Sequence, residues 1–154
     1  EFIRENHLWA FHYSTAIFFR RALCDGSQLP QDANSSSTAR PSGQYLVSKA
    51  LEHLESIDTL TRDQAVANTL WPGFIAAVEA VETDLRHRAL VWFGRAKRHG
   101  IGNITQVISL VMEVWRRVDR QIISLRSKKG VDSELGCVDW RDVMREKGMY
   151  IMLT

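Results

Sequence analysis

The most distinctive stretch of this 154-residue chain is Trp71-Pro-Gly-Phe-Ile-Ala-Ala-Val-Glu-Ala80. An aromatic residue followed by proline predicts a sharp start of a helix, because proline suits the first helical turn. We expect this helix over about 73–82. Its small residues, Gly73, Ala76, Ala77 and Ala80, permit neighbouring helices to approach closely. The stretch therefore predicts a helix that lies tightly packed among other helices.

Working outward from it, apolar residues recur at spacings of three and four along most of the chain, which is the period of an amphipathic helix. This pattern predicts helices over 2–24, 44–60, 62–70, 73–82, 85–98, 104–126 and 140–147. The clearest is 104–126, where Asn103 is placed to cap the helix and a sustained apolar seam resembles a coiled coil. No segment shows sustained strand alternation. The predicted fold class is all-α, an irregular array of about seven helices.

Polar residues at the helix boundaries predict where several helices begin and end. We expect Thr83 or Asp84 to cap the helix at 85–98, and Asp139 to cap the helix at 140–147. Gly148 is expected to close the last helix, since glycine accepts the backbone conformation found there. Residues 149–153 are then expected to tuck in or to pair with another segment.

One segment interrupts the helical pattern for longer than compact domains usually tolerate. Residues 25–43 contain Asp-Gly, two prolines and a serine-rich run, and they predict a mobile Ser/Pro-rich loop after the first helix. We treat residues 1–154 as a single helical domain containing this loop. Because the apolar pattern already runs at Phe2, we expect the chain to be a C-terminal fragment of a larger protein.

The composition excludes several classes of protein. Hydrophobic residues make up 45% and charged residues 25%, which are globular values. Two cysteines, Cys24 and Cys137, are too few for a disulfide framework or a four-thiolate zinc site. Apolar runs are too short to span a membrane, and the charged start lacks a secretory signal pattern. We therefore expect a soluble, reduced, intracellular protein.

Charge is distributed unevenly behind a net value of +2. Residues 44–84 carry 2 basic and 7 acidic groups, whereas residues 85–130 carry 11 basic and 2 acidic groups. Such asymmetry indicates either a surface for nucleic acid or an acidic quarter packed beside a basic quarter within one fold. The small summed charge favours the second interpretation. The candidate basic interaction face consists of Arg95, Lys97, Arg98, Arg116, Arg117 and Arg120.

The sequence offers no recognisable catalytic pattern. It lacks the His-Glu-x-x-His, Gly-x-Ser-x-Gly and phosphate-loop motifs. The nearest candidate for a metal-dependent helical enzyme is Glu79, Glu82 and His87, but a di-iron site needs a second Glu-x-x-His copy that the chain does not contain. We therefore predict that the chain is not an enzyme and that it holds no metal or cofactor.

Several motifs together resemble the fungal-specific transcription factor domain. They are the aromatic first helix ending Phe18-Phe-Arg-Arg21, the Trp71 stretch with Arg86 beyond it, Gly102-Asn103, Val114-Trp-Arg-Arg-Val-Asp119, Asp139-Trp-Arg141 and the end at 148–153. The type it resembles is found in arginine-metabolism regulators, where it lies C-terminal to a binuclear zinc cluster. The motif residues expected to be structural are Trp71, Pro72, Phe74, Glu79, Arg86, Asn103, Trp115, Asp119 and Trp140.

The resemblance implies a regulatory and effector-response domain of a transcription factor in the nucleus. In this family DNA is read by an N-terminal six-cysteine zinc cluster, so zinc is expected only in that module, which this chain lacks. Implied partners are transcription machinery proteins or a small-molecule effector, with DNA bound through the full-length protein. A homodimer is a further partner hypothesis, since the 104–125 seam suits either a coiled coil or the inside of a bundle.

Among the expected structural residues, Glu79 and Arg86 are seven residues apart and can pair only if the break near Thr83 is mild. The alternative function is a stand-alone helical nucleic-acid-binding protein that uses the basic face of residues 86–129.

Overall fold

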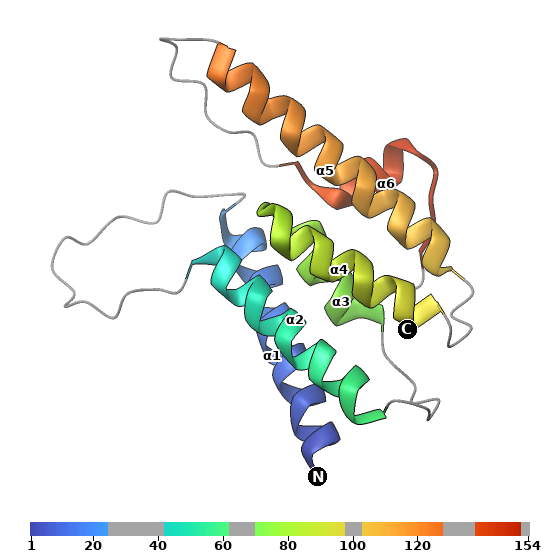
Figure 1. Ribbon diagram of the computed structural model, residues 1–154. Coiled ribbons are helices and arrows are strands. Elements are labelled where there is room, and N and C mark those ends of the chain that lie inside the picture. The colour runs from blue at the N-terminus through green and yellow to red at the C-terminus, as the bar shows by residue number, and fades with distance from the viewer. Residues whose placement is uncertain (25–41, 62–69, 98–102, 128–137, 152–154) are drawn as a thin grey trace, which may run out of the picture.

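The computed structural model describes residues 1–24, 42–61, 70–97, 103–127 and 138–151 (Figure 1). They form the helices α1 (Phe2–Cys24), α2 (Gly43–Thr61), α3 (Leu70–Val78), α4 (Thr83–Ala96), α5 (Ile104–Ser127) and α6 (Trp140–Glu146). The all-α class is confirmed, with six helices and no strand among the described residues. The predicted loop at 25–43 and the predicted helix at 62–70 lie almost entirely outside the described residues.

The short helix α3 lies at the centre of the array and contacts α1, α2, α4 and α5 (Figure 1). Eight of its nine residues are buried, namely Leu70, Pro72, Gly73, Phe74, Ile75, Ala76, Ala77 and Val78. A helix that is apolar on all sides is stable only when other elements cover every side. The remaining helices therefore pack around α3 and cover it.

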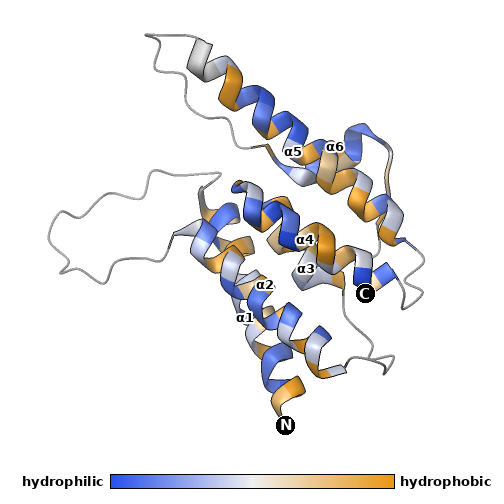
Figure 2. Cartoon of the chain, in the orientation of Figure 1, coloured by the Kyte–Doolittle hydropathy of each residue, from blue (hydrophilic) through white to orange (hydrophobic). Residues whose placement is uncertain are grey.

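The outer helices bury one face each against this centre. The helices α1 and α2 run antiparallel and side by side, and α5 lies with α6 on the other side of α3 and α4 (Figure 1). Blue and orange bands alternate along α5 in Figure 2, as expected for an amphipathic helix. Its predicted seam is buried at Ile104, Val107, Val111, Val114 and Trp115. The seam therefore belongs to the inside of the bundle.

The boundaries of α3 differ from the predicted 73–82. The helix begins at Leu70, so that Trp71 and Pro72 occupy its first turn. Proline is tolerated there because the N–H groups of the first turn have no partner within the helix. The helix ends after Val78, where the Ala80 N–H donates to the Ala77 carbonyl at 3.1 Å. The turn after α3 is thus tighter and earlier than the sequence indicated.

The predicted cap of the next helix is also wrong. The helix α4 begins at Thr83, and its N-cap residue is Glu82, whose side chain makes no capping hydrogen bond. Neither Thr83 nor Asp84 caps the helix, because both lie inside its first turn. The Glu82 N–H instead donates to Oε1 of Gln44, a residue of α2, at 3.4 Å. A distant side chain therefore binds the backbone just before α4, where no local side chain caps the helix.

The cap predictions for α6 are confirmed. The Asp139 side chain accepts a hydrogen bond from the Arg141 N–H at 2.8 Å, which is the usual N-cap geometry. Gly148 closes the helix with a φ of 60°, the conformation that glycine adopts without strain. Met149 and Ile151 then pack against the core, as expected for a segment that tucks in.

Gly73 allows a close contact between α3 and α4. A Cβ atom at this position would lie 2.1 to 2.7 Å from three carbon atoms of the Trp92 ring. Trp92 is only 1% exposed and belongs to α4, so the ring has no free space into which it can move. The absence of a side chain at Gly73 thus sets the distance between α3 and α4.

We predict that Gly73→Ala destabilises the protein by about 1–3 kcal/mol, the usual cost of overpacking a close-packed core. Gly94→Ala is the matched control, because Gly94 lies inside α4 and a Cβ there would meet no atom within 4 Å. This control should instead stabilise the helix by roughly 0.5–1 kcal/mol. Urea unfolding followed by circular dichroism measures both changes. Equal stability of the two variants would contradict the proposed contact.

Candidate functional site at the end of α3

The last residues of α3 and the turn after it form a junction between helices. The final carbonyls of a helix lack partners within the helix, and here they are buried. Nε1 of Trp115 donates to the Ala77 carbonyl at 2.8 Å, and Nε2 of Gln44 donates to the Glu79 carbonyl at 2.9 Å. Nε of Arg86 donates to the Ala80 carbonyl at 3.0 Å. We name these residues the α3 junction: Ala77, Glu79, Ala80, Arg21, Gln44, Arg86 and Trp115.

Gln44 bonds both sides of the turn between α3 and α4. Besides donating to the Glu79 carbonyl, it accepts from the Val81 N–H through Oε1 at 2.9 Å. The same oxygen lies 3.4 Å from the Glu82 nitrogen. One amide side chain at the start of α2 therefore holds the end of α3 and the start of α4 together.

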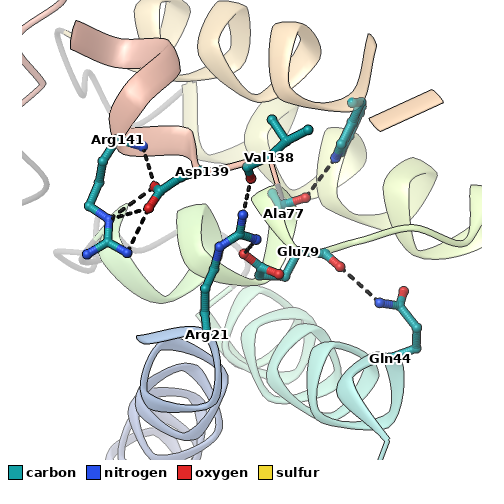
Figure 3. Close-up of polar contacts among 8 residues, drawn as sticks. Arg21, Gln44, Ala77, Glu79, Val138, Asp139 and Arg141 are labelled. Atoms are coloured by element: carbon teal, nitrogen blue, oxygen red, sulfur yellow. Dashed lines mark hydrogen bonds and ion pairs between the residues drawn. The ribbon is translucent and has the colours of Figure 1, made fainter. Parts of the chain in front are cut away.

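The Glu79 side chain forms the charged part of the junction. Its carboxylate pairs with Arg21, which lies in the last turn of α1, and their side chains are 23% and 9% exposed. Arg21 also donates to the carbonyl of Val138, next to the α6 cap residue Asp139 (Figure 3). Burial raises the pKa of Glu79, although the charge and hydrogen bond of Arg21 oppose that shift. The pair connects α1, α3 and the segment before α6.

Arg86 pairs with Asp119 and not with Glu79, the partner that the sequence suggested. It binds Asp119 of α5 through Nη1 at 2.9 Å, and its guanidinium lies 5.3 Å from the centre of the Trp115 ring. The within-helix pair of Glu79 and Arg86 does not form, because α3 ends before Glu79 and turns each side chain towards another helix. Arg86, Trp115 and Asp119 instead join α4 to α5.

Aromatic contacts surround the same helix. The Trp71 ring is half-buried and stacks on Phe11 of α1, with ring centres 5.7 Å apart. Phe74 is fully buried, and its ring meets Trp140 of α6 edge to face at 5.0 Å. The Pro72 carbonyl accepts a hydrogen bond from the buried Ser14 hydroxyl at 3.1 Å. Phe74 is therefore the deeper anchor, and Trp71 lies nearer the surface.

Asn103, the remaining motif residue, lies directly before α5. Its carbonyl accepts from the Val107 N–H at 3.1 Å, which is the first hydrogen bond of that helix. It lies apart from the α3 junction. The structure thus brings Glu79, Arg86, Trp115 and Asp119 together, with Trp71 and Pro72 in the first turn of α3 and Phe74 in its middle.

The candidate basic face is largely occupied by ion pairs. Arg95 lies 3.8 Å from Asp58 of α2, and Arg117 binds Glu146 of α6 at 2.7 Å. Arg116 and Arg117 both pair with Glu113, one turn earlier in α5. Arg98 lies outside the described residues. Lys97 and Arg120 are exposed, and Arg120 has no ionic partner among the described residues.

A further pair explains the charge asymmetry directly. Arg88 of α4 binds Glu55 of α2 through two hydrogen bonds of 2.9 Å and contacts Ser48 at 3.2 Å. The acidic quarter of the chain therefore packs beside the basic quarter, as the small net charge favoured.

Sequence reasoning missed three residues that hold α3 in place, Arg21 and Gln44 at the junction and Ser14 at the first turn of the helix. The sequence indicated Arg21 only as part of a motif and gave no role to Ser14 or Gln44. Ser14 gave one signal, since it is a polar residue within an otherwise apolar stripe of the first helix. Gln44 and Arg21 gave none, because their partners are 35 and 58 residues away in the chain.

The metal hypothesis gains no support from the described residues. Within them, no three His, Cys, Asp or Glu side chains come together in a way that could hold a metal ion. Glu79 is paired with Arg21, while Glu82 and His87 are exposed. Of the helices described, none combines the length and the apolar character needed to cross a membrane.

The fold and the junction define an all-helical domain whose buried and partly buried polar contacts join helices to one another. The sequence model of the fungal-specific transcription factor domain matches residues 2–154, which is almost the whole chain. The chain therefore belongs to the fungal-specific transcription factor domain family, which is not a family of enzymes. No curated protein and no solved structure matches it significantly.

We predict that Arg21→Met destabilises the protein by about 3 kcal/mol at neutral pH, because it leaves a buried carboxylate without its partner. Loss of Arg21 raises the pKa of Glu79 further, since Arg21 is what lowers it. A carboxyl with a raised folded-state pKa favours folding at low pH and loses that contribution as pH rises through the folded pKa. The deficit relative to the wild type should therefore shrink as pH falls from neutral towards 5.

Urea unfolding at a neutral and an acidic pH measures this effect. Lys49→Met is the control, since it removes an exposed pair with Glu52 on the surface of α2. It should change stability little at either pH. A deficit for Arg21→Met that does not depend on pH would show that Glu79 is not the group left unpaired.

Proposed function

We propose that this chain is a regulatory and protein-interaction domain of a fungal transcription factor. In this proposal it transmits effector or partner signals to an N-terminal zinc-cluster module that reads DNA in the nucleus. The chain itself carries no catalytic residues and no cofactor, and zinc belongs to the DNA-reading module. The family match over residues 2–154 is the observation that carries the proposal.

The α3 junction supplies a physical route for such transmission. Its partners come from α1, α2, α4 and α5, and Arg21 adds the segment before α6. Packed helices change between discrete arrangements, since close packing does not deform continuously. An effector that binds one arrangement more tightly shifts the population towards it. A signal received on any of these helices would then be felt at the others through the junction.

The alternative of direct nucleic-acid binding has less support. Binding to phosphates requires basic side chains that are clustered and free to neutralise them. Arg88 and Arg95 are engaged with acidic residues of α2, and Arg117 with Glu113 and Glu146. These pairs leave few free cations on the described part of the basic face. The proposal therefore assigns DNA contact to the full-length protein's separate module.

A reporter assay tests the proposed function. The chain is fused to an unrelated DNA-binding domain, and transcription of a reporter with the matching operator is measured in a fungal host. We expect the fusion to change output several-fold relative to the DNA-binding domain alone. Gln44→Ala should alter that output, because it removes the side chain that holds the α3–α4 turn. Gln106→Ala, on the exposed face of α5, is the matched control.

Unchanged output for the fusion at equal protein level would contradict the regulatory role. Salt-sensitive binding of the isolated chain to duplex DNA would favour the alternative function instead.

A further inference from the structure

The start of α1 and the end of α2 leave a hollow between them. The two helices run antiparallel, so the first turns of α1 lie beside the last turns of α2 (Figure 1). The hollow has a volume of about 480 Å³ and lies at the end of these helices opposite to the α3 junction. We name the α1–α2 hollow by the residues that line it: Phe2, Asn6, Glu52, Glu55, Ser56, Thr59 and Leu60.

The polar side chains that α2 contributes to the hollow present hydrogen-bond acceptors. The Ser56 hydroxyl donates to the Glu52 carbonyl one turn earlier at 2.8 Å. The Thr59 hydroxyl likewise donates to the Glu55 carbonyl at 2.9 Å. Because a hydroxyl has only one proton, each of these oxygens can take part in a further hydrogen bond only as an acceptor. The carboxylates of Glu52 and Glu55 are acceptors as well, so a group that enters the hollow must bring donors.

The charge of the hollow favours a cationic donor. Its described lining includes two carboxylates and no basic side chain. Lys49 binds Glu52 at 2.7 Å, and its hydrogen bond lowers the pKa of that carboxyl, which is therefore ionised at neutral pH. Arg88 binds Glu55 through two hydrogen bonds of 2.9 Å. A carboxylate has about four acceptor sites, so each of the two can bind a second cation from the side of the hollow.

The apolar residues of the hollow match the stem of a basic side chain. Phe2 and Leu60 are 73% and 51% exposed, so both present apolar surface to an incoming group. Lysine and arginine carry their charge at the end of an apolar stem, which packs along such surface. An aromatic ring also attracts a cation that lies over its face. The α1–α2 hollow therefore complements a basic side chain in both shape and charge.

Contacts between α1 and α2 hold the wall of the hollow and extend its apolar surface. Oδ1 of Asn6 lies 2.8 Å from Nδ1 of His53, and Nδ2 of Asn6 donates to the Phe2 carbonyl at 2.9 Å. Trp9 stacks on His53 with ring centres 6.1 Å apart and is 43% exposed. Since Trp9 follows Phe2 by seven residues, both lie on the same face of α1. Exposed aromatic residues of this kind are enriched in protein interfaces.

The openness of the hollow favours a segment of a protein over a small molecule. Sites for small molecules bury most of the surface of their ligand. Here the side chains of Phe2, Glu52 and Leu60 are all more than half exposed, so they cover only one side of a guest. A basic residue within a polypeptide gains further contacts through its neighbours, for which Trp9 offers an apolar surface.

We propose that the α1–α2 hollow binds a lysine or arginine side chain of a partner protein, with apolar neighbours of that residue lying on Trp9. This inference does not depend on the proposed function, since it rests only on the surface of α1 and α2. In a regulatory domain it would place the partner on two helices that also reach the α3 junction, through Arg21 and Gln44.

Titration of the isotope-labelled chain with short peptides, followed by NMR, tests the proposal. The probe is acetyl-Ala-Leu-Lys-Leu-Ala-amide, and the neutral control peptide has glutamine in place of lysine. We expect shift changes at residues 2–9 and 52–60, and binding about fivefold or more tighter for the lysine peptide, because hydrogen bonds between ionised groups are the stronger ones. Nα-acetyl-lysine amide, the same side chain without its neighbours, should bind more weakly than the peptide.

Three variants locate the contact. Glu52→Gln should weaken binding of the lysine peptide about fivefold, whereas Lys49→Met should strengthen it by removing a cation that competes for Glu52. Glu146→Gln is the matched control, since Glu146 of α6 is also paired with a basic residue and its side chain is 58% exposed, against 53% for Glu52. It should leave the dissociation constant unchanged. Circular dichroism checks that each variant keeps its helices.

Several results would overturn the proposal. They are the absence of shift changes up to the solubility limit of the lysine peptide, equal binding of the lysine and glutamine peptides, and a Glu52→Gln variant that binds as the wild type does. Equal binding of the peptide and of Nα-acetyl-lysine amide would show a site for a small cation, and would overturn the assignment to a partner protein.

Discussion

The complete burial of α3 is the constraint on which the rest of the structure depends. A nine-residue helix that is apolar on every side gains its stability from its neighbours and little from its own hydrogen bonds. Carbonyl groups at the end of α3 and in the turn after it are buried or partly buried, and side chains of other helices donate hydrogen bonds to those of Ala77, Glu79 and Ala80. Trp115, Gln44 and Arg86 provide these donors from three different helices. Packing and hydrogen bonding thus fix the same arrangement.

Local features of the sequence predicted local features of the structure. The period of the 104–126 segment predicted both a helix and its buried side, and Asp139 and Gly148 marked the ends of α6. The boundaries of α3 and the start of α4 were wrong because Gln44, which holds the turn between them, lies 37 residues before Val81. Arg21 and Ser14 each reach α3 across 58 residues. No spacing rule connects residues that only the tertiary fold brings together.

The acidic and basic segments of the chain contact each other through ion pairs between helices. Arg88 and Arg95 of α4 face Glu55 and Asp58 of α2, and Arg86 faces Asp119 of α5. Partly exposed pairs of this kind contribute little stability individually. They matter more for orientation, since a helix rotated about its axis would place like charges together. The charge pattern therefore selects among packings that the apolar pattern alone would allow.

The contact between Gly73 and Trp92 has an evolutionary consequence. The two positions share one volume, so changes at them are not independent. A lineage that enlarged residue 73 first would pass through a strained intermediate, whereas one that first reduced residue 92 would pass through a cavity. Both orders lower stability and so carry a fitness cost. The two residues can be replaced one at a time only in a protein whose stability exceeds the minimum that its function requires. Divergence of this domain should therefore proceed around the α3–α4 contact, with the two residues replaced together or retained together.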